Sequence, residues 1–314
     1  MSLPRPSPDL STPISRRVWL GGLLIAGWSP RVGLGDDLDP IRAIGAKARL
    51  GEFKTSKSKH FLGIGDASIA YQVEALAAAE SIGVEFLTHF NDKGFKLAWP
   101  AAPLFVVVLA GVRSYSAFTG DAAEVAVGGH YDVDTNRLVI FDFRRGERPL
   151  TIQAEVVNSR TLAHETIHQL SYNTGLLDPK SDVPLFVDEG LGTYGEIWRP
   201  RNRGKIGQLN AGWLDVLKGA GGGSPWIPIA RLAVEDKLFD DPALVNQAYA
   251  QSWLFTHRAL KTKGVVPEYR AYLETVAKRR DAKGRLDDLR KFFGDLDRLD
   301  GELKRYAKRP VGSA

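Results

Sequence analysis

Thr161-Leu-Ala-His-Glu-Thr-Ile-His-Gln-Leu170 is the stretch that decides the fold and the chemistry of this chain. It places His164, Glu165 and His168 in an HExxH pattern. On an α-helix the two histidines lie one turn apart on the same face, so both imidazoles can reach a single metal ion. Glu165 lies about 100° round the helix, beside the metal rather than on it. A general base for a water molecule is needed at that place, so the pattern predicts a hydrolytic zinc site.

The residues around the pattern place it on a helix. Ala163, Ile167 and Leu170 form the apolar stripe of an amphipathic helix, and Asn173-Thr-Gly175 supplies a C-terminal stop with glycine at the left-handed position. The alternative is a surface helix with two histidines and a solvated glutamate.

A catalytic zinc needs a third protein ligand and an open fourth position, and the candidate for the third ligand is Glu189. The 20 residues between His168 and Glu189 allow a turn and the return of a second helix. Asp182 is the expected N-cap of that helix, and Pro184 suits its first turn.

Other residues near Glu189 have expected roles as well. Asp188 is a competing ligand. Gly190 and Gly192 weaken a helix, and a close approach to the HExxH helix would account for them. The residues on the same helical face as the proposed ligand, which could orient the histidines, are Thr193 and Glu196.

The two segments together resemble a known superfamily. HETIH at 164–168, followed by PLFVDEGLGTYGE at 184–196, is similar to the gluzincin, thermolysin-like metallopeptidases. In that group two HExxH histidines and a downstream helical glutamate bind zinc. The chain also resembles an uncharacterised bacterial family within the superfamily, domain of unknown function 1570, whose members continue with strings like Gln169-Leu170 and Asn173-Thr-Gly-Leu176. The resemblance covers residues 60 to 275. Where relatives have Trp-Leu-x-Glu-Gly-Leu-Ala, this chain has Phe186-Val-Asp-Glu-Gly-Leu-Gly192, a departure that spares the ligand.

The resemblance implies an α+β fold, a thermolysin-like zincin domain over residues 36–314. A helix and sheet half at 36–155 would lie against a mainly helical half at 156–314. The implied activity is hydrolysis of peptide bonds by zinc-bound water that Glu165 activates. Two alternatives stay open: an exported binding or scaffold protein that keeps the fold without turnover, and a zinc amidase acting on cell-wall cross-links.

An oxyanion donor is expected in the helical half. Aminopeptidase-type gluzincins place a tyrosine after the zinc glutamate, and by order along the chain Tyr249 is the candidate, with His257 as a second. Both belong to a helix expected at 242–260, where a tyrosine can also be a core residue with a satisfied hydroxyl. The remaining histidines have no partner spacing and are expected to be structural.

The N-terminus resembles a twin-arginine export signal over residues 1–35. Arg16 and Arg17 precede an apolar run from Val18 to Trp28 that is too short to span a bilayer comfortably. The chain is therefore expected to be an exported bacterial protein, periplasmic or extracellular, without stable membrane insertion after the signal is removed. A disordered tail with one apolar patch is the alternative.

Composition fits a soluble globular protein. The 314 residues are 44% hydrophobic and 25% charged, with a formal net charge of +5. No basic motif with interleaved aromatic residues argues for nucleic-acid binding. The resemblance to the metallopeptidases implies a peptide or protein substrate as the partner. Without cysteine, a zinc site must use histidine and carboxylate. The sequence predicts no oligomeric state.

Periodicity places the other elements. We expect a long helix from an N-cap at Asp66 to Asn91, a buried strand at 103–110, and a hairpin of 126–133 and 137–143 around Asp134-Thr-Asn136. By the resemblance, this hairpin is a candidate peptide-binding edge. The segment 268–306 is expected to be an amphipathic helical finish with both signs of charge on its polar face. Arg199, Arg201, Arg203 and Lys205 form a basic cluster that could favour acidic substrate groups or could simply be solvated.

Overall fold

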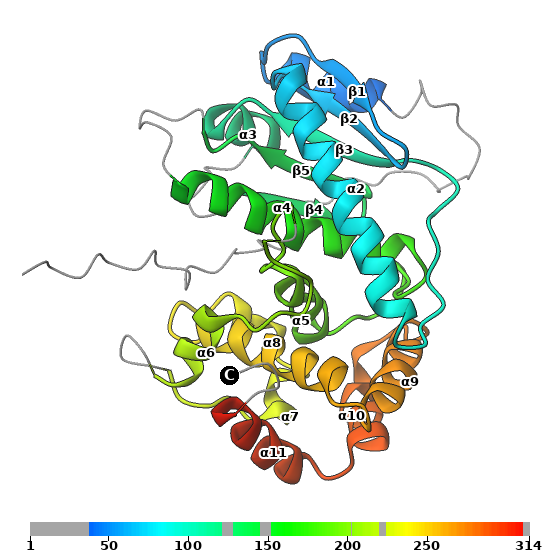
Figure 1. Cartoon of the computed structure of the whole chain (residues 1–314), viewed down its shortest axis with the longest axis vertical. Helices are drawn as coiled ribbons and strands as arrows, with labels where there is room; N and C mark the ends of the chain where they lie inside the picture. The colour runs from blue at the N-terminus through cyan, green and yellow to red at the C-terminus, as the bar shows by residue number, and fades with distance from the viewer. Residues whose placement is uncertain (1–37, 121–127, 145–151, 202, 220–223, 310–314) are drawn as a thin grey trace, which may run out of the picture.

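The computed structural model describes residues 38–120, 128–144, 152–201, 203–219 and 224–309. Figure 1 shows a sheet with its helices in the upper half and a group of helices in the lower half, with α4 and α5 between them. This mixture of helices with a five-stranded sheet is consistent with the predicted α+β class. The predicted export signal lies outside the described residues.

The sheet has five strands in the order β1-β2-β3-β5-β4. The inner strands β2 (Phe61–Gly65), β3 (Leu104–Leu109) and β5 (Arg137–Phe141) are parallel. The edge strands β1 (Lys54–Lys57) and β4 (Gly129–Asp132) are antiparallel to their neighbours. The predicted hairpin is therefore confirmed as β4 and β5, and β4 is an edge strand.

Helices cover both faces of the sheet. Val106 and Val108 of β3 pack in one core and Val107 and Leu109 in another, because successive side chains of a strand point to opposite faces. Helices α2 (Ile69–Asn91) and α4 (Ile152–Asn173) contribute to the first core, whereas α1 (Asp39–Lys47) and α3 (Val112–Thr119) contribute to the second. The helix that contains the HExxH pattern thus lies against the sheet near β4 and β5.

The start of α2 differs from the prediction. Its N-cap is Ser68, whose hydroxyl accepts a hydrogen bond from Tyr71 N, and not Asp66. The Asp66 carboxylate instead accepts hydrogen bonds from Ala110 N and from the Ser114 hydroxyl. Asp66 therefore ties the end of β3 to α3, which local sequence could not indicate.

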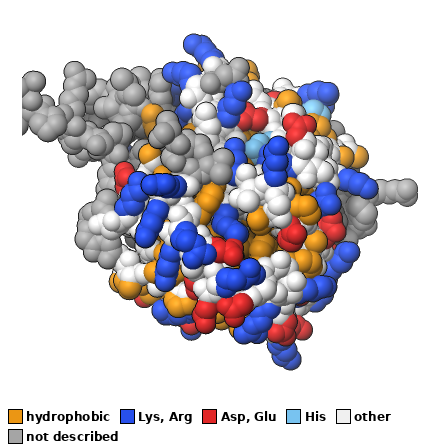
Figure 2. Space-filling view, turned by 60° about the horizontal axis from the view of Figure 1, so that its bottom comes forward, with side chains coloured by type: hydrophobic (Ala, Val, Ile, Leu, Met, Phe, Trp, Pro, Cys, Tyr) orange, Lys and Arg blue, Asp and Glu red, His pale blue; other side chains and the backbone are white. Residues whose placement is uncertain are grey.

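The helical half is built round α5 (Leu185–Gly195) and α8 (Val245–Lys261), which pack against each other. The remaining elements of this half are α6 (Ala211–Leu217), α7 (Ile229–Leu232), η1 (Asp236–Phe239), α9 (Val266–Val276), η2 (Ala282–Gly284), α10 (Arg285–Phe293) and α11 (Leu296–Lys308). The predicted C-terminal helical segment is confirmed as helical but is divided, with Gly294 at φ +76° between its last two helices. Figure 2 shows Lys and Arg side chains next to Asp and Glu on the face of this half that it displays.

The start of α5 is held by an ion cluster around the buried Arg285 guanidinium. Asp182 was the predicted N-cap, but Pro184 occupies that position and has no side-chain hydrogen bond to offer. Leu185 N donates instead to Asp236, and the Arg285 guanidinium contacts the carboxylates of both Asp182 and Asp236. The ligand helix is thus positioned by residues about 50 and 100 positions further along the chain. Within the described residues, no helix is both long and apolar enough to cross a membrane.

Candidate metal centre

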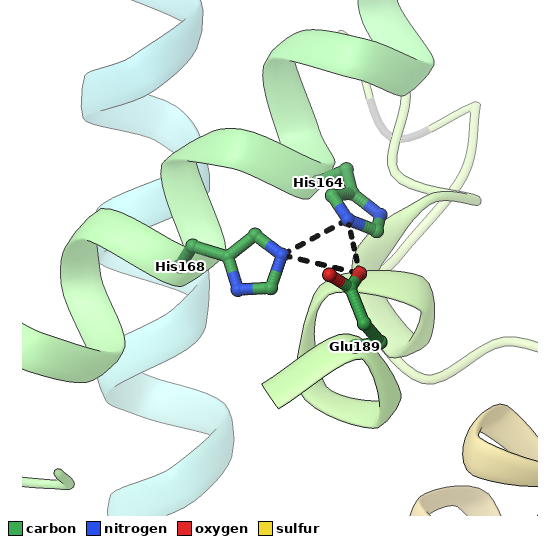
Figure 3. Close-up of side chains that lie close together, drawn as sticks. All are labelled: His164, His168 and Glu189. Carbon is green, nitrogen blue, oxygen red and sulfur yellow. Dashed lines mark hydrogen bonds and ion pairs between the residues drawn. The ribbon is translucent and has the colours of Figure 1, made fainter. Parts of the chain in front are cut away.

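The two histidines of the HExxH pattern converge as their spacing predicts. His164 and His168 lie on one face of α4, and each is about 1% exposed. Their Nε2 atoms are 2.9 Å apart, and Figure 3 shows both rings turned toward the same point.

Glu189 meets this point from α5. Its Oε2 lies 3.1 Å from Nε2 of His164 and 3.6 Å from Nε2 of His168 (Figure 3). Gly192 makes this approach possible, because a Cβ there would lie 2.7 Å from Nε2 of His168 and 2.8 Å from Nε2 of His164. Gly190 serves a different contact, since its Cβ would meet Thr256 and Ser252 of α8. The prediction that both glycines face the HExxH helix is correct only for Gly192.

The three donor atoms suit a metal ion. Ligands 2.0–2.1 Å from a tetrahedral zinc ion lie roughly 3.3 Å apart, and the observed separations bracket that value. The group His164, His168 and Glu189 is fully buried and could hold an ion.

A second carboxylate orients each imidazole. Oε1 of Glu196 lies 3.1 Å from Nδ1 of His164, and Oδ1 of Asp188 lies 2.8 Å from Nδ1 of His168. When each Nδ1–H donates to its carboxylate, both Nε2 lone pairs point at the shared position. Asp188, predicted as a competing ligand, therefore binds the other side of His168.

Glu196 has partners that sequence reasoning missed. Its carboxylate accepts hydrogen bonds from Trp213 Nε1 at 2.9 Å and from Asn210 Nδ2 at 3.3 Å. Arg160 of α4 forms an ion pair with it at 3.2 Å and lies over the Trp213 ring. These residues come from distant parts of the chain, so no local pattern groups them. Thr193, the other predicted partner, instead donates to the backbone oxygen atoms of Glu189 and Gly190.

The electrostatics are dominated by these carboxylates. Burial alone would lower the pKa of His164, but hydrogen bonds with Glu189 and Glu196 raise it to about 9. For His168, burial is likewise outweighed by Asp188 and Glu189, which raise its pKa to about 10. Burial would raise the pKa of Glu189, yet the two imidazoles hold it below its usual value. The centre thus favours positive charge at the point where the three donors meet.

Glu165 lies beside the donors and is bound to the sheet. The backbone N–H of Tyr131, on the edge strand β4, donates to Oε2 of Glu165 at 2.7 Å. The side chain is 3% exposed. A backbone contact of this kind has no signature in the side-chain sequence.

The two predicted oxyanion donors occupy different surroundings. Tyr249 is buried on α8, with its ring stacked on Trp213 at 6.0 Å and against Phe239 at 5.3 Å. Because Trp213 binds Glu196, Tyr249 lies behind the residues that orient His164, and its role as an oxyanion donor stays a prediction. Nδ1 of His257 lies 3.0 Å from the Tyr306 hydroxyl, an arrangement that does not favour His257 in that role.

The predicted basic cluster is largely engaged with its own backbone. Arg199 donates to the carbonyl groups of Glu196 and Trp198, and Arg203 donates to that of Pro200. Arg201 has a left-handed backbone conformation, with φ +61°. These contacts favour a role in shaping the turn after α5.

A family comparison covers the metal centre. Residues 158–281 match a family described as a protein of unknown function, DUF1570. No curated protein matches the chain. The matched segment contains the HExxH residues, Glu189 and Tyr249, and it begins after β5, so the similarity to this uncharacterised family lies in α4 and the helical half.

Proposed function

We propose that the chain is a zinc-dependent hydrolase of peptide bonds, of the gluzincin type. The observation that carries the proposal is the convergence of His164, His168 and Glu189, with Glu165 fixed beside them. The imidazoles are also oriented as metal ligands usually are, because each Nδ1 is held by its own carboxylate.

Zinc is the metal that this donor set suits best. Two imidazoles and one carboxylate are the ligands of a common class of catalytic zinc sites, in which the fourth position stays open. Zinc held there would act as a Lewis acid toward a water molecule and a carbonyl oxygen.

Glu165 is the proposed general base. Its carboxylate takes a proton from the water whose oxygen bonds to the scissile carbonyl carbon, and it returns that proton to the amine nitrogen as the C–N bond breaks. The Tyr131 N–H holds Oε2 of Glu165, which fixes the carboxylate beside the metal donors. Tyr249 remains the candidate for hydrogen bonding to the oxyanion.

Strand β4 is the proposed peptide-binding edge. It lies at the margin of the sheet and contacts α4 through Tyr131 and Glu165. Because the Tyr131 N–H points away from β5 and toward Glu165, a strand added along β4 would lie next to the general base. We also propose that the protein is exported from the cytoplasm, because residues 1–35 resemble a twin-arginine export signal.

Zinc content and peptide cleavage test the proposal together. The full chain and Glu165→Gln are each loaded with zinc and incubated with a peptide library. Both should bind one zinc ion, and only the native chain should cleave. Zinc binding without cleavage by the native chain would favour the binding-protein alternative, and cleavage of cell-wall amides alone would favour the amidase.

A further inference from the structure

A pocket of about 310 Å³ lies where the C-terminal ends of α2 and α4 meet α9. It is bounded by the segment that follows α2, by the turn that follows α4, and by one face of α9. Figure 1 shows the lower end of α2 next to α9. The residues that line the pocket include none of the metal donors. Its volume is near the lower end of the range for ligand pockets, so it suits a small molecule or the end of a larger one.

The floor of the pocket is apolar. Phe95 and Leu97 come from the segment after α2, Leu176 comes from the turn after α4, and Leu273 comes from α9. All four side chains are buried and belong to the larger core. Phe95 packs edge-on against Phe90 of α2, with the ring centroids 5.1 Å apart. An apolar group that enters the pocket would therefore leave water for a closely packed apolar surface.

The wall of the pocket is held in place by the chain itself. The Asn91 side chain accepts a hydrogen bond from Leu97 N at 2.8 Å and donates one to Leu97 O at 3.0 Å. Ala98 N donates to the carbonyl group of Thr174, at the end of α4, at 3.3 Å. Because these contacts already order the segment after α2, binding would cost little further conformational entropy.

The rim of the pocket has two cations and one carboxylate, Lys96, Arg270 and Glu274. Nη1 of Arg270 donates to Gly94 O at 2.9 Å, and only a glycine leaves room for the guanidinium there, because a Cβ at Gly94 would meet Nη1. Nε of Arg270 lies 3.9 Å from Oε1 of Glu274, which is too far for a hydrogen bond. Among the described residues, Nη2 of Arg270 has no acceptor and Lys96 has no carboxylate at ion-pair distance. The guanidinium is thus fixed in position with N–H groups still available.

We propose that this pocket binds a carboxylate that is attached to an apolar group. The planar guanidinium of Arg270 matches the two oxygens of a carboxylate, and the Lys96 ammonium adds a second positive charge. The apolar floor then takes the attached group. Because the rim has two positive charges and one negative charge, it favours a monoanion over a neutral molecule of the same shape. No residue of the metal centre takes part, so this site does not depend on the proposed peptidase activity.

Calorimetric titration of the chelator-treated full chain with N-acetylphenylalanine tests the site. Metal is removed first, because a zinc ion would itself bind a carboxylate. We expect N-acetylphenylalanine to bind. Its amide, which lacks the negative charge, and acetate, which lacks the apolar group, should each bind at least about tenfold more weakly. An affinity for either of these ligands equal to that for N-acetylphenylalanine would overturn the proposal.

Two double variants locate the binding. Lys96→Gln with Arg270→Gln removes both cations of the rim and should weaken binding of N-acetylphenylalanine at least about tenfold. Lys278→Gln with Arg305→Gln removes the same charge from exposed residues outside the pocket and should leave binding unchanged. Equal affinities in the native chain and the rim variant, or equal losses in the two double variants, would overturn the proposal.

A single variant covers the case in which the rim double variant does not fold, since Arg270 also holds Gly94. Lys96 is exposed, so Lys96→Gln should fold like the native chain and should weaken binding about threefold. An unchanged affinity in this variant would overturn the proposal.

A peptide ligand distinguishes two sources of the carboxylate. Glycylglycylphenylalanine has the same apolar end and the same charge on a peptide. Its binding indicates that the end of a peptide fits the pocket, and its rejection indicates a small carboxylic acid. Both outcomes uphold the site. Because every titration uses the metal-free chain, failure of the zinc proposal would leave these results unchanged.

Discussion

The two faces of α5 differ in whether their ionisable side chains are paired with oppositely charged groups. Toward α4, four buried carboxylates (Glu165, Asp188, Glu189 and Glu196) surround two imidazoles and one guanidinium. Toward α8, the described contacts of His89 and His257 are with the hydroxyls of Tyr194 and Tyr306. Because a buried charge is costly without a partner, the first face fits a divalent cation, whereas burial keeps the two imidazoles of the second face neutral by lowering their pKa. One helix thus separates a charged centre from two uncharged imidazoles.

The largest expected effect is on the rate of cleavage, when the proposed general base Glu165 is replaced. Glu165→Gln should lower the rate of peptide cleavage by about 10² to 10⁴ while metal binding is retained, because the amide cannot accept the proton. Initial rates with a peptide that the native chain cleaves provide the measurement. Glu268→Gln, on the exposed start of α9, is the control. Unchanged cleavage by Glu165→Gln would remove Glu165 from the mechanism.

A third cluster shows what complete pairing within the chain contributes to stability. Arg285, which is 5% exposed, pairs with Asp182 and Asp236 at the start of α5. Arg285→Met should lower the free energy of unfolding by about 2 kcal/mol, since the partly exposed Asp236 loses its partner and Asp182 keeps only Arg279 at 3.8 Å. Arg290→Met removes an exposed ion pair with Asp287 and should cost less than about 1 kcal/mol. Urea unfolding of both variants measures the difference, and equal losses would show that Arg285 does not hold α5.

The carboxylates that orient the imidazoles should affect the affinity for metal. Asp188→Ala leaves Nδ1 of His168 without its acceptor and should weaken zinc binding by about 10- to 100-fold. Competition with a chelator of known affinity measures this change. Asp178→Ala, at an exposed ion pair with Arg280, should have no effect on zinc. An unaltered zinc affinity in Asp188→Ala would mean that the histidine orientation is fixed by packing alone.

One histidine on each face of α5 should make stability respond to pH in opposite directions. In the metal-free chain the pKa of His168 is raised to about 10, so its contribution to stability is complete below about 6.5 and is lost as pH rises toward 10. The pKa of His257 is lowered to about 4, so the unfolded chain binds its proton first and stability falls as pH drops from about 6.5 toward 4. Unfolding midpoints of the chelator-treated chain across this range test both signs. His257→Gln should lose less stability at acid pH than the native chain, and an equal loss in both would contradict the second assignment.

The smallest effect is expected from a single lysine. Lys261→Gln removes the repulsion from Lys93 and should raise the free energy of unfolding by a few tenths of a kcal/mol, about the size of one exposed charge pair. Lys263→Gln, exposed two positions further, should leave it unchanged. Thermal unfolding at low ionic strength compares the two, and destabilisation by Lys261→Gln would mean that the lysines do not repel each other.

The three metal ligands could be predicted from the sequence because they follow local sequence patterns. His164 and His168 are fixed by helical periodicity, and Glu189 follows in a helix whose Gly192 signals a close approach. The start of that helix was predicted less well, because Asp182 is held by Arg285 rather than by a free backbone N–H.

The remaining contacts depend on tertiary structure. Trp213 and Arg160 meet at Glu196 from separate helices, and the Tyr131 N–H reaches Glu165 from a strand. The opposite face was missed because His89 and His257 are far apart in the sequence.

Zinc analysis of the full chain beside Glu189→Ala tests the central claim most directly. The account predicts one zinc ion per chain in the native protein and none that survives dialysis in the variant, because two imidazoles alone hold zinc weakly. Absence of zinc from the native chain after reconstitution, or equal zinc in both proteins, would contradict the three-residue metal centre.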